Sequence, residues 1–458
     1  MEDQALLLSS QDYSLLTDLY QLTMVACYTG ESLDQRQASF ELFVRHLPSR
    51  FGYLIAAGLA QAIEYLQQLR FTAEQIASLQ AIGTFEHAPD RFWQLLAEGQ
   101  FTGDLWAVPE GTAIFANEPL LRVEAPLWQA QLVETYLLNT LNYQSLIATK
   151  AARMRDVAGD DARLLEFGTR RAFSPQGAIW AARAAIAGGL DSTSNVLAAL
   201  KLGQAPSGTM AHSLVMALSA LAGSEDQAFL AFHQYFPGAA LLIDTYDTIA
   251  AAKRLAERVK AGELEVKAIR IDSGDLGVLS KQVRQLLPDT AIFVSGDLDE
   301  YEIARLKSED AEIDGYGLGT KLVTGAPANG VYKLVEIDGM PMMKESSGKA
   351  TYPGRKQIFR RFGSTGRFLG DRLGLMHETP QPDEQPLLQP VIQQGKVIQP
   401  PEPVATIAQR TRTQVISLPD SVRRIQEPDS AQVEITPLLQ ELTQRTQARI
   451  HTAYTRQT

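Results

Sequence analysis

The sequence predicts an α/β protein in which a (β/α) barrel follows a smaller N-terminal α/β domain. The chain has 458 residues, more than one hydrophobic core usually holds, and 45% of them are apolar. Short apolar strand candidates alternate with helical stretches in the middle of the chain. Each of these strand candidates ends in polar or glycine-containing sequence, as barrel strands do where they carry a site. The expected domains are residues 1–150, 151–345 and 346–458.

The first domain mixes helix and strand. Apolar residues recur at helical spacing over residues 15–28, and residues 38–45 alternate in the manner of a half-buried strand. Over residues 101–123, turn residues separate short apolar runs, which predicts a compact antiparallel sheet. Residues 134–155 predict a long helix that leads into the barrel.

The barrel follows as a series of βα repeats. Its strand candidates are residues 163–167, 239–244, 266–272, 291–295 and 313–319. From 379 to 403 the chain is rich in Pro and Gln, which predicts an extended segment on the surface. Apolar spacing over 436–450 predicts a closing helix.

Charge and cysteine content exclude several classes of protein. The net charge is -11, with 53 acidic against 42 basic residues, which argues against nucleic acid or an anionic membrane as the main partner. The lone cysteine excludes an internal disulfide framework and suits a reducing cytoplasm. No run of about 18 apolar residues occurs, and the N-terminus lacks the basic start of a signal peptide. We therefore expect a cytoplasmic protein.

Two segments carry groups that suit an anionic aromatic ligand and a phosphate. They are Glu166-Phe-Gly-Thr-Arg-Arg171 and Gly208-Thr-Met-Ala-His-Ser213. A guanidinium matches a carboxylate or phosphate bidentately, and an aromatic ring can lie flat on a planar heterocycle. Taken singly, an Arg pair after a strand more often lies on a solvent-exposed surface than in a binding site. A His near small residues is likewise more often a packed side chain than a functional one. Their occurrence together favours a site.

Three later loops add oxygen and amide groups. Asp272-Ser-Gly-Asp275 and Ser295-Gly-Asp297 offer carboxylates that can grip ribose hydroxyls or hold Mg²⁺ with a diphosphate. Gly317-Leu-Gly-Thr320 offers unobstructed backbone amides and a hydroxyl for phosphate. An Asp-rich turn or a Gly-x-Gly sequence alone is weak evidence for a binding site, because ordinary tight turns have the same sequences. Their position after late barrel strands is the stronger signal.

His212 is the candidate nucleophile. A nucleophilic imidazole needs a carboxylate on its second nitrogen, which fixes the tautomer and stabilises the cation that forms. Asp244 ends the next strand candidate and is the expected partner.

These segments resemble the nicotinate phosphoribosyltransferases of the type II phosphoribosyltransferase fold, and the resemblance covers nearly the whole chain. It implies an irregular (β/α) barrel with an N-terminal α/β sandwich domain to which the C-terminal segment also contributes. The motifs that carry it are Leu16-Thr-Asp-Leu-Tyr-Gln-Leu-Thr-Met24, Glu166-Phe-Gly-Thr-Arg-Arg171, Gly189-Leu-Asp-Ser-Thr-Ser-Asn195, Gly208-Thr-Met-Ala-His-Ser213, Arg270-Ile-Asp-Ser-Gly-Asp-Leu276, Gly317-Leu-Gly-Thr320 and Gly330-Val-Tyr-Lys-Leu334.

The resemblance implies a reaction of NAD biosynthesis. Nicotinate and 5-phosphoribosyl 1-diphosphate would give nicotinate mononucleotide and diphosphate, with Mg²⁺ present and ATP hydrolysed alongside. His212 matches the histidine that the family phosphorylates transiently.

The resemblance also implies roles for further residues. Phe167 would stack on the pyridine ring, and Tyr20 would close the other face from the neighbouring subunit of a homodimer. Arg170 or Arg171 would meet the carboxylate; we place Arg170 there and Arg171 at phosphate. The expected nicotinate residues are Tyr20, Phe167, Arg170, Thr209 and Arg270. The expected phosphoribosyl and phosphate residues are Arg171, Asp272, Gly296, Asp297, Gly319 and Thr320, and metal ligands stay unassigned.

Alternatives from within and outside the fold stay open. A nicotinamide-specific enzyme would want an acceptor such as Asp191 at the pyridine end, whereas Asp191 beside a carboxylate substrate would instead orient an arginine. A quinolinate-using enzyme would want a denser basic cluster and no ATP-linked histidine. A barrel that only binds a pyridine nucleotide, without catalysis, could do without His212.

Overall fold

The computed structural model describes residues 6, 8–345 and 351–455. The chain divides into two compact units. Unit 1 is made of residues 1–146, 327–403 and 417–458, and unit 2 is made of residues 147–326 and 404–416. Unit 1 contains mixed and antiparallel sheets, and unit 2 contains a parallel sheet, so the α/β fold class expected from the sequence is confirmed.

The main sheet of unit 1 has the strand order β13-β12-β1-β5-β3-β17-β18. Its strands are β1 (Gln37–Val44), β3 (Asp104–Ala107), β5 (Pro119–Pro126), β12 (Gly330–Ile337), β13 (Met340–Pro341), β17 (Gln389–Gln393) and β18 (Lys396–Val397). The sequence predicted β1 as half-buried, but every residue after Gln37 is buried. Both faces of β1 are therefore covered, and the polar side chains that alternate along it are buried too.

The extended segment expected over residues 379–403 contributes strands to two sheets. Within it, β17 pairs antiparallel with β3, and the register shifts between Pro390 and Ile392. A proline has no N–H to donate to the ladder, so it is tolerated beside such an irregularity. This part of the chain is thus a component of unit 1 and not only a surface crossing.

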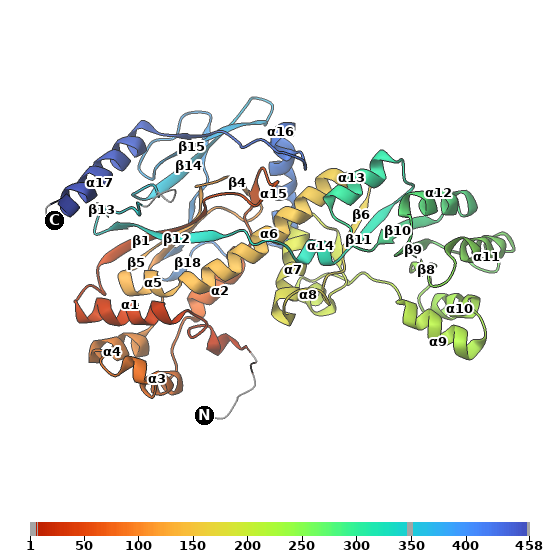
Figure 1. Cartoon of the computed structure of the whole chain (residues 1–458), viewed down its shortest axis with the longest axis horizontal. Helices are drawn as coiled ribbons and strands as arrows, with labels where there is room; N and C mark the ends of the chain where they lie inside the picture. The colour runs from red at the N-terminus through yellow and green to blue at the C-terminus, as the bar shows by residue number, and fades with distance from the viewer. Residues whose placement is uncertain (1–5, 7, 346–350, 456–458) are drawn as a thin grey trace. The chain divides into compact units, whose positions relative to one another are not determined.

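The remaining elements of unit 1 are two smaller sheets and a set of helices (Figure 1). The smaller sheets are β2 (Leu54–Ile55) with β4 (Ala113–Ile114), and β14 (Lys356–Phe362), β15 (Phe368–Leu375), β16 (Glu384–Pro386) and β19 (Val433–Ile435). The helices are α1 (Leu19–Gly30), α2 (Leu59–Gln68), α3 (Ala73–Gln80), α4 (Asp90–Glu98), α5 (Leu127–Leu132), α16 (Asp420–Arg423) and α17 (Pro437–Thr455), with 3-10 turns at η1 (Ser10–Asp12) and η2 (Gly83–Phe85).

Unit 2 is built on a six-stranded parallel sheet in the order β7-β6-β11-β10-β9-β8 (Figure 1). The strands are β6 (Arg163–Glu166), β7 (Ser192–Thr193), β8 (Leu241–Leu242), β9 (Ala268–Ile271), β10 (Ala291–Ser295) and β11 (Gly315–Leu318). Five of them lie within the strand candidates of the sequence. β7 was not predicted, because a strand of two residues is too short to show a periodicity.

Helices connect the parallel strands. α6 (Glu134–Ala158) precedes β6, as the sequence predicted. The others are α7 (Pro175–Ala187), α8 (Val196–Lys201), α9 (His212–Ala222), α10 (Glu225–Tyr235), α11 (Thr248–Lys260), α12 (Leu276–Leu286), α13 (Glu300–Ser308), α14 (Thr320–Val323) and α15 (Val404–Ser417). No helix among the described residues is both long enough and apolar enough to cross a membrane.

An irregular segment joins the two edges of the parallel sheet. Residues 204–211 form neither helix nor strand. Within this segment, Ser207 N donates to Thr193 O at 2.9 Å, beside edge strand β7. The Thr209 hydroxyl donates to Ala240 O, beside edge strand β8. The segment thus spans the open side of the irregular barrel between β7 and β8, and we call the face of the sheet that it covers the inner face.

Helix α15 completes unit 2 from a distant part of the chain. Its Ile407 is fully buried and belongs to one hydrophobic cluster with Ile186 and Ala187 at the end of α7. Thr411 Oγ1 of α15 donates to Ala187 O at 2.7 Å. Unit 2 is therefore completed by residues 404–416, which come after residues 327–403 of unit 1 in the sequence.

Candidate functional site

The inner face of the barrel carries a pocket with a volume of about 350 Å³. Every second residue of a strand faces the same side of a sheet. Arg163, Leu165 and Phe167 from β6 and its end, and Ala268 and Arg270 from β9, follow this spacing. The rest of the lining consists of Pro206, Ser207, Gly208, Thr209, Gly238, Ala239, Ala240, Phe293 and Gly317. Of the pocket residues, Phe167, Thr209 and Arg270 were predicted as site residues from the sequence, whereas Arg163 and Phe293 were not.

Two glycines of β11 make room for the aromatic rings of this pocket. A Cβ at Gly317 would lie 2.6 Å from two ring carbons of Phe167, and a Cβ at Gly315 would lie 2.5 Å from a ring carbon of Phe293. Both distances are shorter than a side chain tolerates, so any larger residue would push the ring away. The Gly315-Tyr-Gly317 spacing within β11 therefore serves ring packing.

Arg270 lies beside the Phe167 ring and has unused hydrogen-bonding capacity. Its guanidinium carbon is 5.9 Å from the ring centroid, within cation–π range. Burial lowers the pKa of Arg270, while the carboxylates of Asp272 and Asp244 act in the opposite direction. Among the described residues, the buried Nε atom has no hydrogen-bond partner. A desolvated guanidinium with a free donor is a strong site for an anion.

Glu166, to which the sequence analysis gave no role, holds the turn that carries Phe167. Its buried carboxylate accepts hydrogen bonds from Gly168 N and from Thr193 Oγ1. Burial raises the pKa of Glu166, and the two hydrogen bonds oppose that shift. Phe167 N extends the ladder by donating to Leu318 O at 2.7 Å. The signal for Glu166 was present in the sequence, since an acidic residue ending an apolar strand needs buried partners.

Arg170 and Arg171 follow in the same turn and are both exposed. Within the described part of the chain, neither guanidinium makes a hydrogen bond or an ion pair. Arg170 is near enough to Arg270 to lower the pKa of that residue. The turn therefore presents cations at the carboxyl end of β6 that are available to an anionic ligand.

His212 and Asp244 lie next to each other at the carboxyl end of the barrel. His212 begins α9, and its Nε2 atom is 3.9 Å from Asp244 Oδ1, which is too far for a hydrogen bond. Its Nδ1 atom is 3.1 Å from Thr245 Oγ1. Asp244 is almost fully buried, and its Oδ1 has no hydrogen-bond partner among the described residues. The sequence did not indicate Thr245, which holds the imidazole from the other side.

The Asp272 loop is tied to both neighbouring strand ends. Asp272 N and Ser273 Oγ donate to Asp244 Oδ2 at 3.0 and 2.6 Å. The Ser295 hydroxyl donates to Asp272 Oδ1. Gly296 follows with φ of 103°, and Asp297 with φ of 49°, so this loop turns through the left-handed region. Both residues are exposed beside Asp272.

The remaining loop is the short one after β11. Gly319 caps α14, and Thr320 is the first residue of that helix. Both are partly exposed, at the same end of the barrel as Asp272 and Gly296. By contrast, Asp275 accepts from Val278 N at 3.1 Å and caps α12, so the second carboxylate of the Asp272 loop has a structural task.

Comparison with known proteins identifies the family. Residues 15–142 match the nicotinate phosphoribosyltransferase (NAPRTase) N-terminal domain, residues 162–294 the nicotinate phosphoribosyltransferase (NAPRTase) family, and residues 383–443 the C-terminal domain. The chain is 43% identical over 427 residues to nicotinate phosphoribosyltransferase pncB2 of Mycobacterium tuberculosis, covering 90% of this chain and 89% of that protein. The chain belongs to the nicotinate phosphoribosyltransferase family.

Two further members of the family are similar over most of their length. The nicotinate phosphoribosyltransferase of Bacillus subtilis is 43% identical over 384 residues, covering 80% of this chain and 76% of that protein. The crystal structure of human nicotinic acid phosphoribosyltransferase superposes with a TM-score of 0.83 at 31% identity, covering 94% of this chain and 99% of that chain. This likeness confirms the fold expected from the sequence.

Two residues considered from the family resemblance lie away from the inner pocket or in the other unit. Asp191 Oδ2 accepts from Arg155 Nη2 and from Leu164 N, both at 2.6 Å, and Asp191 does not line the pocket. Its partner Arg155 does not line the pocket either. Tyr20 belongs to α1 of unit 1 and is 47% exposed.

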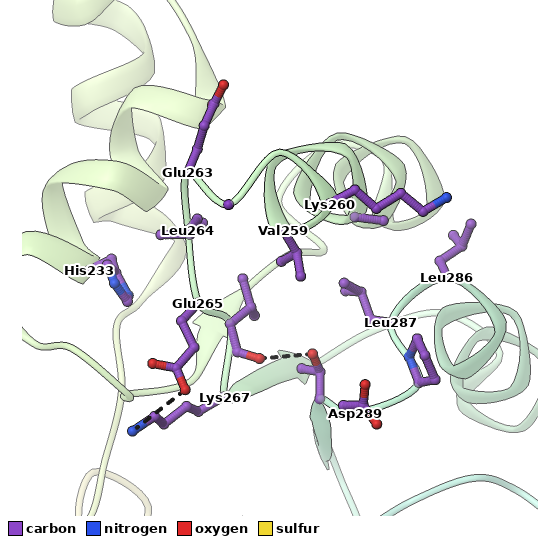
Figure 2. A pocket seen from close by; sticks show the side chains of 15 residues that line it. His233, Val259, Lys260, Glu263, Leu264, Glu265, Lys267, Leu286, Leu287 and Asp289 are labelled. Atoms are coloured by element: carbon purple, nitrogen blue, oxygen red, sulfur yellow. Dashed lines mark hydrogen bonds and ion pairs between the residues drawn. The ribbon is translucent and has the colours of Figure 1, made fainter.

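A second hollow in unit 2, with a volume of about 670 Å³, lies near the amino ends of β9 and β10 (Figure 2). Figure 2 shows charges of both signs around it, among them Lys260, Glu263 and Asp289, and an ion pair of 3.9 Å between Lys267 and Glu265. None of the candidate site residues lines it. The candidate site is therefore the inner pocket together with the carboxyl ends of the strands.

Proposed function

We propose that this protein transfers the phosphoribosyl group of 5-phosphoribosyl 1-diphosphate to nicotinate. The observation that carries the proposal is the pairing of Arg270 with Phe167 on the inner face of the barrel. A pyridine ring can stack on Phe167 while its carboxylate receives hydrogen bonds from the desolvated guanidinium of Arg270. Family membership supports the same substrate, because the named relatives are nicotinate phosphoribosyltransferases.

The reaction joins the pyridine nitrogen to C1 of the ribose as the bond from C1 to the diphosphate breaks. Asp272 would hold the ribose hydroxyls, and Gly296, Asp297, Gly319 and Thr320 would receive the 5-phosphate. Thr209 and Arg170 would assist at the carboxylate, and Arg171 at phosphate. Backbone amides at glycine loops are unobstructed and suit phosphate oxygens.

Mg²⁺ is proposed to enter with the diphosphate. Among the described residues, no group of three or more ligating side chains lies together as a metal cage. Mg²⁺ commonly keeps several waters and binds through one or two carboxylates and substrate phosphates. Asp272 and Asp297, on adjacent loops, fit that pattern. The ion would neutralise charge on the leaving diphosphate.

His212 is proposed to accept the γ-phosphoryl group of ATP. A ring nitrogen forms a bond to phosphorus, the bond to the ADP oxygen breaks, and water later hydrolyses the phosphohistidine. Asp244 faces the ring with a buried oxygen that has no hydrogen-bond partner among the described residues, and it would stabilise the imidazolium that forms. The free N–H groups of the first turn of α9 would favour the phosphoryl group.

We also propose a homodimer with shared sites. Tyr20 is exposed on α1, and an aromatic side chain there could close the second face of the pyridine ring in a neighbouring copy. A cytoplasmic location stays a prediction from cysteine usage.

An assay of nucleotide formation tests this proposed reaction. 5-phosphoribosyl 1-diphosphate is supplied in the presence of Mg²⁺ with nicotinate, nicotinamide or quinolinate, each with and without ATP. We expect nicotinate mononucleotide as the preferred product and a higher yield with ATP. Preference for nicotinamide would contradict the role given to Arg270. Absence of turnover with all three pyridines, together with nucleotide binding, would favour the non-catalytic alternative.

The histidine is tested separately with His212→Ala. This variant should lose ATP hydrolysis and the incorporation of label from γ-labelled ATP. His233→Ala is the matched control, since His233 lines the hollow away from the site and should retain both. ATP hydrolysis that survives in His212→Ala would overturn the assignment of His212.

A further inference from the structure

Helix α6 reaches the phosphate end of the barrel through one lysine. Lys150 Nζ donates a hydrogen bond to Thr324 O at 2.5 Å and another to Lys321 O. These carbonyls terminate α14, the short helix whose first residues are the phosphate candidates Gly319 and Thr320. The last carbonyls of a helix have no partner within the helix, so a cation that binds them fixes where the helix ends.

The lysine has little freedom in this position. Burial lowers the pKa of Lys150, and the carboxylates of Glu300 and Asp299 oppose this shift. Gly325 follows the turn with φ of 146°, and a Cβ there would lie 3.3 Å from Lys150 Nζ. The backbone after α14 therefore passes so close to the ammonium that glycine suits the position.

The same helix also holds the neighbouring phosphate loop. One turn further along α6, Arg153 Nε donates to Glu300 Oε1 at 3.0 Å, and both side chains are buried. Glu300 begins α13, directly after the Gly296 and Asp297 loop. Lys321 and Asp299 link the two loops through an ion pair of 3.9 Å. Both loops expected at the 5-phosphate are thus tied to one face of α6.

We propose that Lys150 is a positioning residue for the 5-phosphate, acting through the α14 turn on Gly319 and Thr320. The inference rests on the proposed function, because it assumes that these two residues bind phosphate. Lys150 itself need not touch the ligand. Loss of its two hydrogen bonds would let the α14 turn shift and misalign the amides, which weakens phosphate binding without altering the pyridine pocket.

Lys150→Met tests this, since it keeps the length of the side chain and removes the donor. We expect the dissociation constant for 5-phosphoribosyl 1-diphosphate with Mg²⁺, measured by titration calorimetry without nicotinate, to rise about tenfold, or about 1.4 kcal/mol. The KM for nicotinate should stay within about twofold. Lys150→Arg should recover most of the affinity, because a guanidinium can also donate to both carbonyls.

Lys307→Met is the matched control. Lys307 Nζ also binds the last carbonyls of a helix, those of Val157 and Ala158 at 2.9 Å, but it lies away from the phosphate loops. It should leave the dissociation constant unchanged. A Lys150→Met protein that binds within twofold of the parent, or a loss that Lys307→Met shares equally, would overturn the proposal.

A second variant covers the case in which Lys150→Met does not fold. Thr324 Oγ1 donates a hydrogen bond to Thr320 O at 2.7 Å. Thr324→Val removes this hydrogen bond and so loosens the same turn, while the charge of Lys150 is kept. It should also weaken binding, and unchanged binding would count against the proposal. A parent protein that binds 5-phosphoribosyl 1-diphosphate but forms no nicotinate mononucleotide would refute the proposed function. The effect of Lys150→Met on the dissociation constant could still be measured in that case.

Discussion

A methyl group at position 317 would occupy space that the Phe167 ring now fills. Gly317→Ala should therefore raise the KM for nicotinate by about tenfold or more, because the ring must leave its stacking position. Gly83→Ala is the control, since a Cβ there has no atom within 4 Å. Steady-state kinetics with a thermal unfolding check would decide. Unchanged nicotinate binding in Gly317→Ala would mean that Phe167 is not the stacking surface.

Arg270 should set the preference for a carboxylate over an amide. Arg270→Met should lower kcat/KM for nicotinate by about 100-fold, in line with the loss of a charge-assisted pair worth about 2–3 kcal/mol. The ratio of nicotinate to nicotinamide turnover should fall with it. Arg305→Met provides a control, because Arg305 makes only exposed ion pairs on α13. A retained ratio in Arg270→Met would contradict the assignment.

Much of the site could be predicted at this scale because its residues follow strands. Phe167, Arg270, Asp272 and Gly296 were expected near one another, and the parallel sheet brings their strand ends to one edge. Thr245 was not predicted, since a hydroxyl beside an Asp carries no pattern of its own. In the proposed homodimer, the position of Tyr20 relative to the pyridine would be set by the interface between two copies, which no local sequence pattern describes.

At the scale of elements, the β14–β15 hairpin holds a buried charge cluster in unit 1. Arg360 of β14 binds Asp371 of β15 through hydrogen bonds of 2.9 and 2.6 Å, and both are fully buried. Glu118, just before β5, is buried beside them. Burial, and then the Asp371 carboxylate, raise the pKa of Glu118 well above its usual range. Folding thus favours the protonated form of Glu118, compared with the unfolded chain, in which the carboxyl has its ordinary pKa of about 4.5.

The raised pKa of Glu118 determines whether the free energy of unfolding rises or falls with pH. A carboxyl whose pKa is raised by folding contributes fully below its unfolded pKa, and that contribution is lost as the pH rises through the folded pKa. Glu118→Gln should remove this loss, since an amide can donate to Asp371 at any pH. Its free energy of unfolding relative to the parent should therefore improve from pH 5 to pH 9, by at most about 1.4 kcal/mol per pH unit.

Urea unfolding at several pH values would measure this difference. Glu384→Gln serves as the control, because the hydrogen bond with Arg372 lowers the pKa of Glu384. That carboxyl is ionised in both states above pH 5, so the effect of its substitution should stay flat there. A flat profile for Glu118→Gln as well would contradict the protonated cluster.

Elements were predicted well where their pattern is long and poorly where it is short. The helix α6 and strand β10 match their expected ranges closely. β7 has two residues and carries no periodicity that can be recognised, whereas β8, also of two residues, lies within the strand candidate at residues 239–244. β17 lies in the segment that was expected to be extended on the surface, and its pairing with β3 was not expected because proline is disfavoured in a sheet.

At the scale of the whole molecule, unit 2 depends on α15. Ile407→Ala should lower the free energy of unfolding by about 2–5 kcal/mol, because it opens a cavity against Ile186 and Ala187. Ile416→Ala on the same helix is the control, since Ile416 is 57% exposed and should change stability by at most about 0.5 kcal/mol. Equal effects of the two substitutions in chemical denaturation would contradict the packing role of α15.

The return of α15 to unit 2 has a consequence for biosynthesis. Domains usually fold one after another as the chain leaves the ribosome. Here the barrel lacks a buried side of α7 until residues 404–416 have emerged, and residues 327–403 of the other unit are made first. A nascent chain with every candidate catalytic residue already translated would still expose Ile186 and Ala187. Each unit needs residues that are translated after residue 403, so we expect neither core to be complete before that point.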